Sequence, residues 1–313
     1  MSQFCVRPDV QAFLEALAAA PRPAFTAQVL AAIRGRSITP EMTGDRSVGE
    51  LAEVRDFKMP GPHGDLALRL FDARAHRQPG LVVVFYHGGG FAVGSIDTHA
   101  GLAAEIARQL DLPVVSVEYR LAPENPWPAA PDDAEAAARW IAANGAAFGR
   151  ELSGLILCGD SAGGNLAIVT ALALRDRPAA LPVRLQILLY PGVDRSGTYQ
   201  SRAMFAQGYG LDGAEMAMFD QHYAADPEHP RNSPLRADQC GMPATLVVTA
   251  GLDPLRDEGR AYAAATVLAG VPTVFHEAMG NIHGFATYRR GIPSAQTDLE
   301  IVLGLARTLL IAP

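Results

Sequence analysis

The chain has 313 residues, of which 49% are hydrophobic and 19% charged, and its formal net charge is −7. This composition predicts a folded globular protein rather than a disordered one. The acidic balance, without any basic tract, argues against nucleic acid or an anionic membrane surface as a partner, because both attract clustered cations.

The first predicted element is an amphipathic helix near the N-terminus, where apolar residues recur at helical spacing at Val10, Phe13, Leu14 and Leu17. Charged residues interrupt this stretch, so it does not predict a signal peptide. The longest uncharged run, residues 78–96, contains several glycines and a histidine. We therefore expect a buried strand and a turn there, and no transmembrane helix.

Strand and helix patterns alternate from residue 81 onward. Short β-rich runs predict buried strands at 81–86, 112–119, 155–158, 183–190, 244–251 and 272–278. Helical patterns occupy 98–110, 130–149, 164–177, 256–270 and 294–310. This alternation predicts an α/β fold with a mostly parallel sheet and helices on both faces. Upstream, residues 51–60 and 65–72 predict an antiparallel hairpin at the edge of the sheet.

Two regions, 1–45 and 194–226, do not follow the alternation. We interpret 1–45 as the N-terminal part of a helical cap and 194–226 as an inserted cap segment over the carboxyl edge of the sheet. A plain surface excursion is the alternative for the inserted segment. The core would then consist of 46–193 and 227–313, forming a single domain with the cap.

Ser161 lies in the sequence Gly-Asp-Ser-Ala-Gly, between a predicted strand and a predicted helix. A tight strand-to-helix turn holds such a serine in a strained conformation that exposes its hydroxyl, and small neighbours avoid clashes there. A serine needs a base to become a nucleophile, and the expected chain order is serine, acid, histidine. Asp253 and His283 follow later predicted strands and fit that order.

Other acids and histidines fit this order less well. Asp257 lies about one turn into a predicted helix and suits a helix-dipole role. His276 is placed on a strand, and His87 precedes the serine.

Three consecutive glycines follow the strand at 81–86. Such a loop brings backbone N–H groups close to a ligand, as stabilisation of an oxyanion requires. We predict that the N–H groups of Gly88, Gly89 and Ala162 form the oxyanion hole, and that His87 anchors the loop.

These motifs together resemble the hormone-sensitive-lipase-like esterases, bacterial family IV of the α/β-hydrolase fold. The resemblance covers about residues 50–310 and also includes 119–130, 253–259 and 283–285. It implies an eight-stranded, mostly parallel sheet with a helical cap, the triad Ser161, Asp253 and His283, and hydrolysis of short- to medium-chain carboxylic esters without a cofactor or metal. Homodimers are common among relatives, so a homodimer is expected by analogy.

Two positions depart from the family. Relatives usually carry a smaller aromatic residue at the position of Trp127, which we expect to change only packing. They usually carry an apolar residue, often methionine, at the position of Asn281. Asn281 is consistent with an added hydrogen bond near the site, an altered acyl preference or an engineered substitution.

A serine carboxylesterase acting on a small-molecule ester is the predicted function. The alternative is a non-catalytic small-molecule-binding relative, such as the plant gibberellin receptors, which lack the histidine that this chain retains. The three cysteines are widely spaced and outside metal-ligand patterns, so we expect reduced thiols in a cytoplasmic protein. Candidates for the pocket wall, some of which are expected to be ordinary core, are Phe91, Phe205, Tyr209, Leu211, Met216, Phe219, Ile282 and Phe285.

Overall fold

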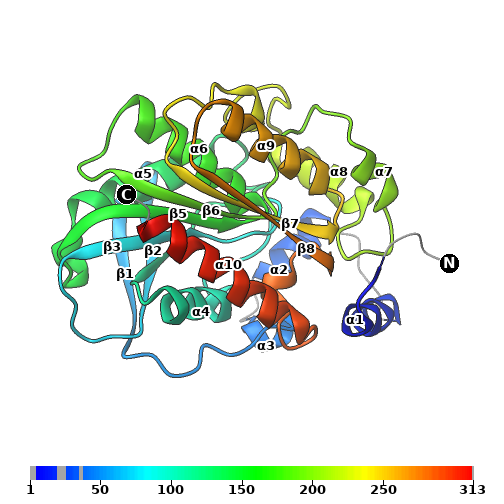
Figure 1. Ribbon diagram of the computed structural model, residues 1–313, viewed down its shortest axis with the longest axis horizontal. Coiled ribbons are helices and arrows are strands. Elements are labelled where there is room, and N and C mark those ends of the chain that lie inside the picture. The colour runs from blue at the N-terminus through cyan, green and yellow to red at the C-terminus, as the bar shows by residue number, and fades with distance from the viewer. Residues whose placement is uncertain (1–4, 20–25, 35–37, 312–313) are drawn as a thin grey trace.

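The computed structural model describes residues 5–19, 26–34 and 38–311, and Figure 1 shows their arrangement around one sheet. Among the described residues the sheet has eight strands in the order β1-β2-β4-β3-β5-β6-β7-β8. Their bounds are β1 Glu53–Gly61, β2 Gly64–Asp72, β3 Gly80–Tyr86, β4 Val114–Val117, β5 Leu152–Asp160, β6 Val183–Leu189, β7 Ala244–Leu252 and β8 Thr273–Ile282.

Strand β2 runs antiparallel to both of its neighbours, β1 and β4, and the pairs from β4 through β8 are parallel. The predicted edge hairpin is therefore confirmed, with β1 as the edge strand. Crossover connections carry the chain between the parallel strands and bring their carboxyl ends to one edge. That edge is where the sequence motifs converge.

Helices cover both faces of the sheet. On one face lie α4 (Ala100–Leu110) and α10 (Ser294–Ile311), and on the other lie α5 (Ala129–Ala143), α6 (Ala162–Asp176) and α9 (Arg256–Leu268). Alternate residues of β3 point to opposite faces: Val82 and Val84 belong to one apolar core, Val83 and Phe85 to the other. This explains why the strand reads as an unbroken hydrophobic run.

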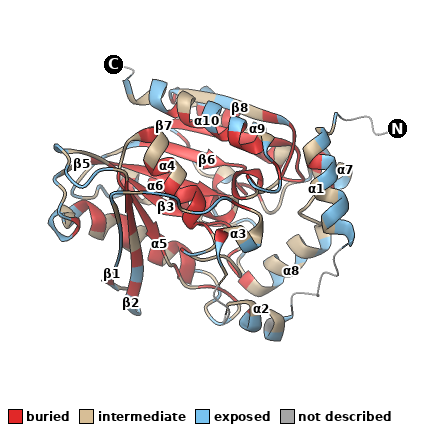
Figure 2. Cartoon of the chain, turned by 90° about the horizontal axis from the view of Figure 1, so that it is seen from below, coloured by how far each residue is buried: buried red, intermediate tan, exposed pale blue. Residues whose placement is uncertain are grey.

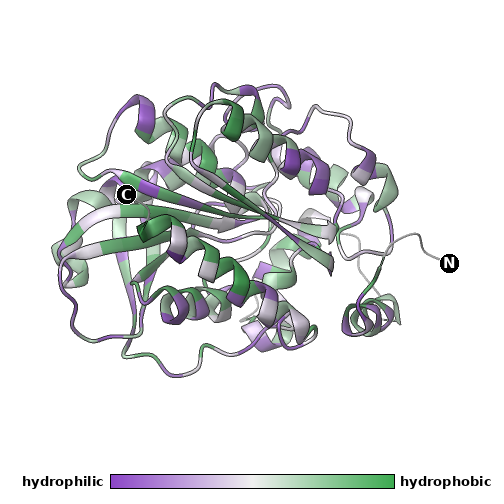
Figure 3. Cartoon of the chain, in the orientation of Figure 1, coloured by the Kyte–Doolittle hydropathy of each residue, from purple (hydrophilic) through white to green (hydrophobic). Residues whose placement is uncertain are grey.

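Burial and hydropathy follow the same layering. Figure 2 shows buried residues concentrated in the central strands, with exposed residues on the outer sides of the surrounding helices. Hydrophobic colour follows the strands in Figure 3, and hydrophilic colour is spread over the outer helices and loops. The core predicted from the apolar runs is thus the two-sided core of the sheet.

Five short elements lie beyond the carboxyl edge of the sheet, towards the N-terminal label in Figure 1. They are α1 (Pro8–Ala19), α2 (Ala27–Arg34), α3 (Pro40–Thr43), α7 (Gln200–Met204) and α8 (Gly213–Tyr223). The first three belong to the region 1–45, whose residues 1–4, 20–25 and 35–37 lie outside the described part of the chain. The other two form the segment between β6 and β7.

Some predicted boundaries were wrong for identifiable reasons. The strand predicted at 155–158 extends to Asp160, because backbone pairing with β3 and β6 continues through the glycine and aspartate of the motif. The helix predicted at 130–149 ends at Ala143 and is followed by a separate 3-10 turn, Gly145–Phe148. Two further 3-10 turns are Pro234–Arg236 and Phe285–Thr287.

Candidate active site

Ser161 occupies the turn between β5 and α6, with φ 53° and ψ −114°. This backbone conformation is strained for a residue with a Cβ, by about 1–3 kcal/mol. The flanking glycines permit the tight turn by close approach: a Cβ on Gly163 would lie 1.9 Å from the carbonyl oxygen of Tyr86. The glycines of the motif are therefore required because a larger residue would collide with the backbone that packs around the Ser161 turn.

The structure brings the three predicted side chains together. Ser161 Oγ lies 2.9 Å from His283 Nε2, and His283 Nδ1 lies 2.8 Å from Asp253 Oδ2. Asp253 is fully buried after β7, and its other oxygen accepts the N–H of Leu255 at 2.8 Å. These contacts join residues 122 and 30 positions apart in the chain. The arrangement can transfer a proton from the serine to the imidazole.

The rival acid has a different environment. Asp257 accepts the N–H of Ser201 at 2.9 Å and forms ion pairs with Arg256 and Arg260. Its position in the first turn of α9 agrees with the structural role expected from the sequence.

The glycine loop follows β3 beside Ser161, but one of its predicted roles is wrong. The N–H of Gly88 donates to Asp160 Oδ1 at 2.8 Å, so it is not available to an oxyanion. Gly89 and Gly90 line the pocket with Ser161, and both have positive φ. Ala162 is the first residue of α6, where N–H groups lack partners within the helix.

A buried polar cluster lies behind this loop. His99 Nε2 is 3.4 Å from Asp160 Oδ1, and His99 Nδ1 is 2.8 Å from Thr98 Oγ1, an oxygen whose own hydrogen bond goes to the carbonyl of Ser95. Both ring nitrogens thus have an oxygen acceptor nearby, as a protonated imidazole requires, and the N–H of Gly88, which bonds with Asp160 at 2.8 Å, also lies 3.3 Å from Nε2. Burial opposes that charge, but Asp160 outweighs it and raises the pKa of His99.

His87 anchors the loop, as predicted, and does so in the neutral form. Complete burial, followed by the charge of His99, lowers the pKa of His87 to about 3. Its ring stacks on Tyr119 with centroids 4.2 Å apart, and the Tyr119 hydroxyl donates to the carbonyl oxygen of His87 at 2.7 Å.

This geometry can be set beside known proteins. A family model described as alpha/beta hydrolase fold matches residues 83–287. The chain belongs to this family. Relatives in Mycobacterium tuberculosis include esterase LipI, 38% identical over 77% of this chain and 78% of LipI, and carboxylesterase NlhH, 33% identical over 92% of each.

Solved structures agree with these relatives. The hyperthermophilic esterase from the archaeon Pyrobaculum calidifontis has a TM-score of 0.86 and 34% identity, over 99% of this chain and 100% of that one. Ester-hydrolase EH1AB1 from the metagenome of Lake Arreo has a TM-score of 0.86 and 36% identity, over 96% and 98%. The predicted fold and the resemblance to hormone-sensitive-lipase-like esterases are confirmed, and the protein is a carboxylic ester hydrolase.

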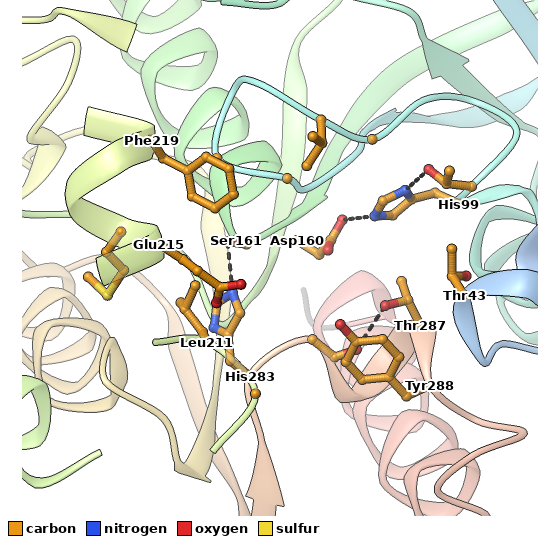
Figure 4. A pocket seen from close by; sticks show the side chains of 18 of the residues that line it. Thr43, His99, Asp160, Ser161, Leu211, Glu215, Phe219, His283, Thr287 and Tyr288 are labelled. Carbon is orange, nitrogen blue, oxygen red and sulfur yellow. Dashed lines mark hydrogen bonds and ion pairs between the residues drawn. The ribbon is translucent and has the colours of Figure 1, made fainter. Parts of the chain in front are cut away.

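The hydrolase has a pocket of about 390 Å³ beside Ser161. In Figure 4, Leu211, Glu215 and Phe219 enter it from one side, and His99, Thr43, Thr287 and Tyr288 lie on the other, with Ser161 and His283 near the middle. The first side comes from the segment between β6 and β7. The second combines α3, α4 and the loop after β8, so the pocket forms where these elements meet.

Only part of the predicted pocket wall lines this cavity. Leu211, Met216 and Phe219 do so. The other candidates lie outside it: Phe91, Phe205, Ile282 and Phe285 are core residues at most 1% exposed, and Tyr209 packs edge-on against Phe205. Apolar character alone did not separate cavity from core. The sequence interpretation missed several lining residues for which it had no motif, namely Ile33, Ile38, Thr43, Arg195, Glu215, Thr287 and Tyr288.

Asn281 supports the loop that carries His283. Its Nδ2 donates to Asp298 Oδ2 at 2.9 Å, and its Oδ1 accepts the N–H of Ile282 at 3.0 Å. Arg7 donates to both oxygens of the same aspartate, at 2.6 and 3.0 Å. Of the roles considered for Asn281, an added hydrogen bond near the site matches these contacts.

Trp127 lies against His229 in an edge-on contact, with centroids 4.9 Å apart. This agrees with a packing role. Within the described ranges, no helix is both long and apolar enough to cross a membrane.

Proposed function

We propose that this hydrolase cleaves its ester through an acyl-enzyme on Ser161, with His283 as general base and acid and Asp253 as the group that orients the imidazole. The observation that carries the proposal is the continuous chain of contacts from Ser161 Oγ through both ring nitrogens of His283 to Asp253, at 2.9 and 2.8 Å. Asp253 accepts a hydrogen bond from Nδ1, which leaves Nε2 free to take the serine proton.

The reaction then proceeds in two acyl-transfer steps. Ser161 Oγ attacks the ester carbonyl carbon while its proton moves to His283 Nε2, and the tetrahedral intermediate expels the alcohol, which receives that proton. A water molecule next loses a proton to His283 and attacks the acyl carbon. The second tetrahedral intermediate expels Ser161 Oγ, which takes that proton back from His283, and the carboxylic acid is released.

The oxyanion formed in each step is assigned to the N–H groups of Gly89, Gly90 and Ala162. This revises the original set by replacing Gly88, whose N–H bonds with Asp160. The exchange is consistent with the loop geometry, since Gly89 and Gly90 line the cavity with Ser161. Preorganised backbone donors of this kind typically contribute about 10²–10³ each in turnover.

The substrates proposed are esters with short or medium acyl chains. A cavity of about 390 Å³ with an apolar side formed by Leu211, Met216 and Phe219 supports this size class. Profiling kcat/KM across a series of unbranched acyl chains tests it. A steady rise in kcat/KM to long fatty acyl chains would contradict it.

An organophosphonate probe tests the mechanism. We expect the probe to label Ser161 with loss of activity, and Ser161→Ala to lose labelling and at least about 10⁴-fold of kcat. Ser47→Ala, at an exposed serine outside the pocket, provides a control that should still be labelled. Normal hydrolysis by Ser161→Ala would refute the proposed nucleophile. Activity should also fall on acidification, because the base must be neutral.

Three further proposals concern the whole protein. Residues 1–45 and 194–226 would form one cap over the core 46–193 and 227–313, a division supported by the position of the described cap helices in Figure 1. A homodimer is proposed by analogy with the family, and light scattering of the purified protein measures it. A cytoplasmic location is proposed from the free cysteines Cys5, Cys158 and Cys240.

A further inference from the structure

Arg195 brings a cation into the substrate pocket. It lies in the loop after β6 and lines the same cavity as Ser161, and its side chain is only 9% exposed. One guanidinium nitrogen, Nη2, lies 3.2 Å from the position that a Cβ on Gly192 would take. Gly192 in turn donates its N–H to the carbonyl oxygen of Ser161 at 3.3 Å. The guanidinium thus packs against Gly192, which is hydrogen-bonded to the backbone of Ser161.

The protein supplies only some of the partners that the Arg195 guanidinium can bind. Nη1 lies 3.2 Å from Asp220 Oδ1, but the Asp220 side chain is 49% exposed, so solvent screens the pair. Nε has no hydrogen-bond partner among the described residues, but it is buried away from both solvent and the cavity, so contacts with a ligand must come from Nη1 and Nη2. The ring of Phe91, 5.8 Å from the guanidinium carbon, supplies a cation–π contact but no strong acceptor. A guanidinium that lines the cavity and whose ion-pair partner is screened by solvent favours an acidic ligand.

Nearby acids are otherwise engaged. Glu258 is fully buried and its charge interacts with that of Arg195, but its hydrogen bonds come from Arg202 Nη2 at 2.6 Å and the N–H of Val193 at 2.8 Å. Glu215 also lines the pocket, but one of its oxygens accepts the N–H of Asp212 at 3.0 Å in the capping box of α8. Asp160, the other acidic residue of the lining, lies against His99.

We propose that Arg195 binds a carboxylate carried by the substrate, so that the preferred substrates are esters bearing a free carboxylate on one arm, such as monoesters of dicarboxylic acids. The planar guanidinium matches a carboxylate through paired N–H donors. Glu215 and Asp160 disfavour an anion beside them in the same pocket, which leaves Arg195 as its cationic partner. This inference rests on the proposed function, because the ester must reach Ser161.

The experiment compares matched esters by pH-stat titration. Monoethyl adipate and ethyl hexanoate differ by a carboxylate on the acyl arm, and a butyrate ester of hydroxybutanoate and butyl butyrate differ by a carboxylate on the alcohol arm. For one of these pairs, the wild-type kcat/KM should be at least as high for the charged member. For that pair, Arg195→Met should lower the charged-to-neutral ratio by about 10–100-fold, the usual range for a charge-assisted contact.

Two variants separate recognition from general charge and folding effects. Arg195→Lys keeps the charge but loses the paired donors, so the ratio should fall less than in Arg195→Met. Arg177→Met removes a cation that is 76% exposed and outside the pocket, and it should leave the ratio unchanged.

An unchanged ratio in Arg195→Met, or a wild-type preference of more than about tenfold for the neutral member of both pairs, would overturn the inference. If Arg195→Met does not fold, the inference is tested by the charged-to-neutral ratio of kcat/KM in the wild type and in Arg195→Lys. Failure of the proposed function looks different, because no ester would then be hydrolysed and the phosphonate would not label Ser161.

Discussion

Replacing Asp160 by asparagine removes one buried negative charge but keeps the shape of the side chain and an oxygen that accepts hydrogen bonds. In the native protein, Oδ1 accepts the N–H of Gly88 at 2.8 Å and lies 3.4 Å from His99 Nε2. Asp160 is only 3% exposed. The substitution therefore weakens two charge-assisted contacts that hold the glycine loop beside Ser161.

The stability loss should depend on pH. Burial opposes both charges, but each partner outweighs it: His99 lowers the pKa of Asp160 below 3.8, and Asp160 raises the pKa of His99 above 6.5. The contribution of Asp160 is present above its ordinary pKa and is lost as the pH falls through the lowered value. The contribution of His99 is fully present below 6.5 and is lost as the pH rises through the raised value.

Asp160→Asn should therefore cost most between these limits. At about pH 5 it breaks a buried ion pair, and we expect a loss of about 3 kcal/mol in the free energy of unfolding. At a pH above the raised pKa of His99, the ion pair is absent from the native protein as well, and the remaining loss is about 1 kcal/mol from a weaker bond to Gly88. Denaturant unfolding at the two pH values measures the difference.

Turnover should fall as well. Gly89 and Gly90 directly follow Gly88, so a looser bond to Gly88 misplaces the proposed oxyanion donors. We expect kcat to fall about 10–100-fold with little change in KM. Asp176→Asn removes a carboxylate that is 63% exposed and serves as the control. Equal stability losses at both pH values, or an unchanged kcat, would refute this account of the loop.

Two further substitutions test the surroundings of the site. Asn281→Leu removes the hydrogen bond to buried Asp298 and should cost about 1–3 kcal/mol of unfolding free energy, measured by denaturant titration. An unchanged stability would show that the contact contributes nothing. Gly90→Ala places a Cβ 2.4 Å from the Phe219 ring at a φ of 59°, so we expect kcat to fall about 10²-fold. Adding Phe219→Ala should restore part of the loss, whereas no recovery would assign the whole effect to backbone strain.

The sequence was enough to predict which side chains meet at the triad, because parallel strands fix where their carboxyl ends lie. Once the strand before Ser161 is recognised, Asp253 and His283 follow from the strands β7 and β8 that precede them. The choice of oxyanion donors did not follow in the same way. It depends on the direction of each N–H in the glycine loop, and Asp160, 72 residues away, determines that of Gly88.

The pocket wall was the least predictable part, because aromatic and aliphatic residues suit a cavity and a core equally well. Phe91 illustrates this: it lies next to the glycine loop, yet it is 1% exposed and stacks on Tyr223 with ring centroids 3.9 Å apart. Polar residues that do line the pocket, such as Thr43 and Thr287, come from elements that no motif connects to Ser161. Only the packing of the N-terminal elements and the loop after β8 places them there.

Buried charge links these separate elements to the reacting groups. Arg289, 1% exposed after the loop that carries His283, donates to both oxygens of fully buried Asp45, which follows α3. Asp298 similarly connects Arg7, just before α1, with Asn281. Because breaking a buried pair is costly, the pair of Arg289 and Asp45 favours a single docking position of the N-terminal segment, and the partly exposed pair of Arg7 and Asp298 adds a weaker restraint. The segment that forms part of the pocket wall is thereby held in one position relative to His283.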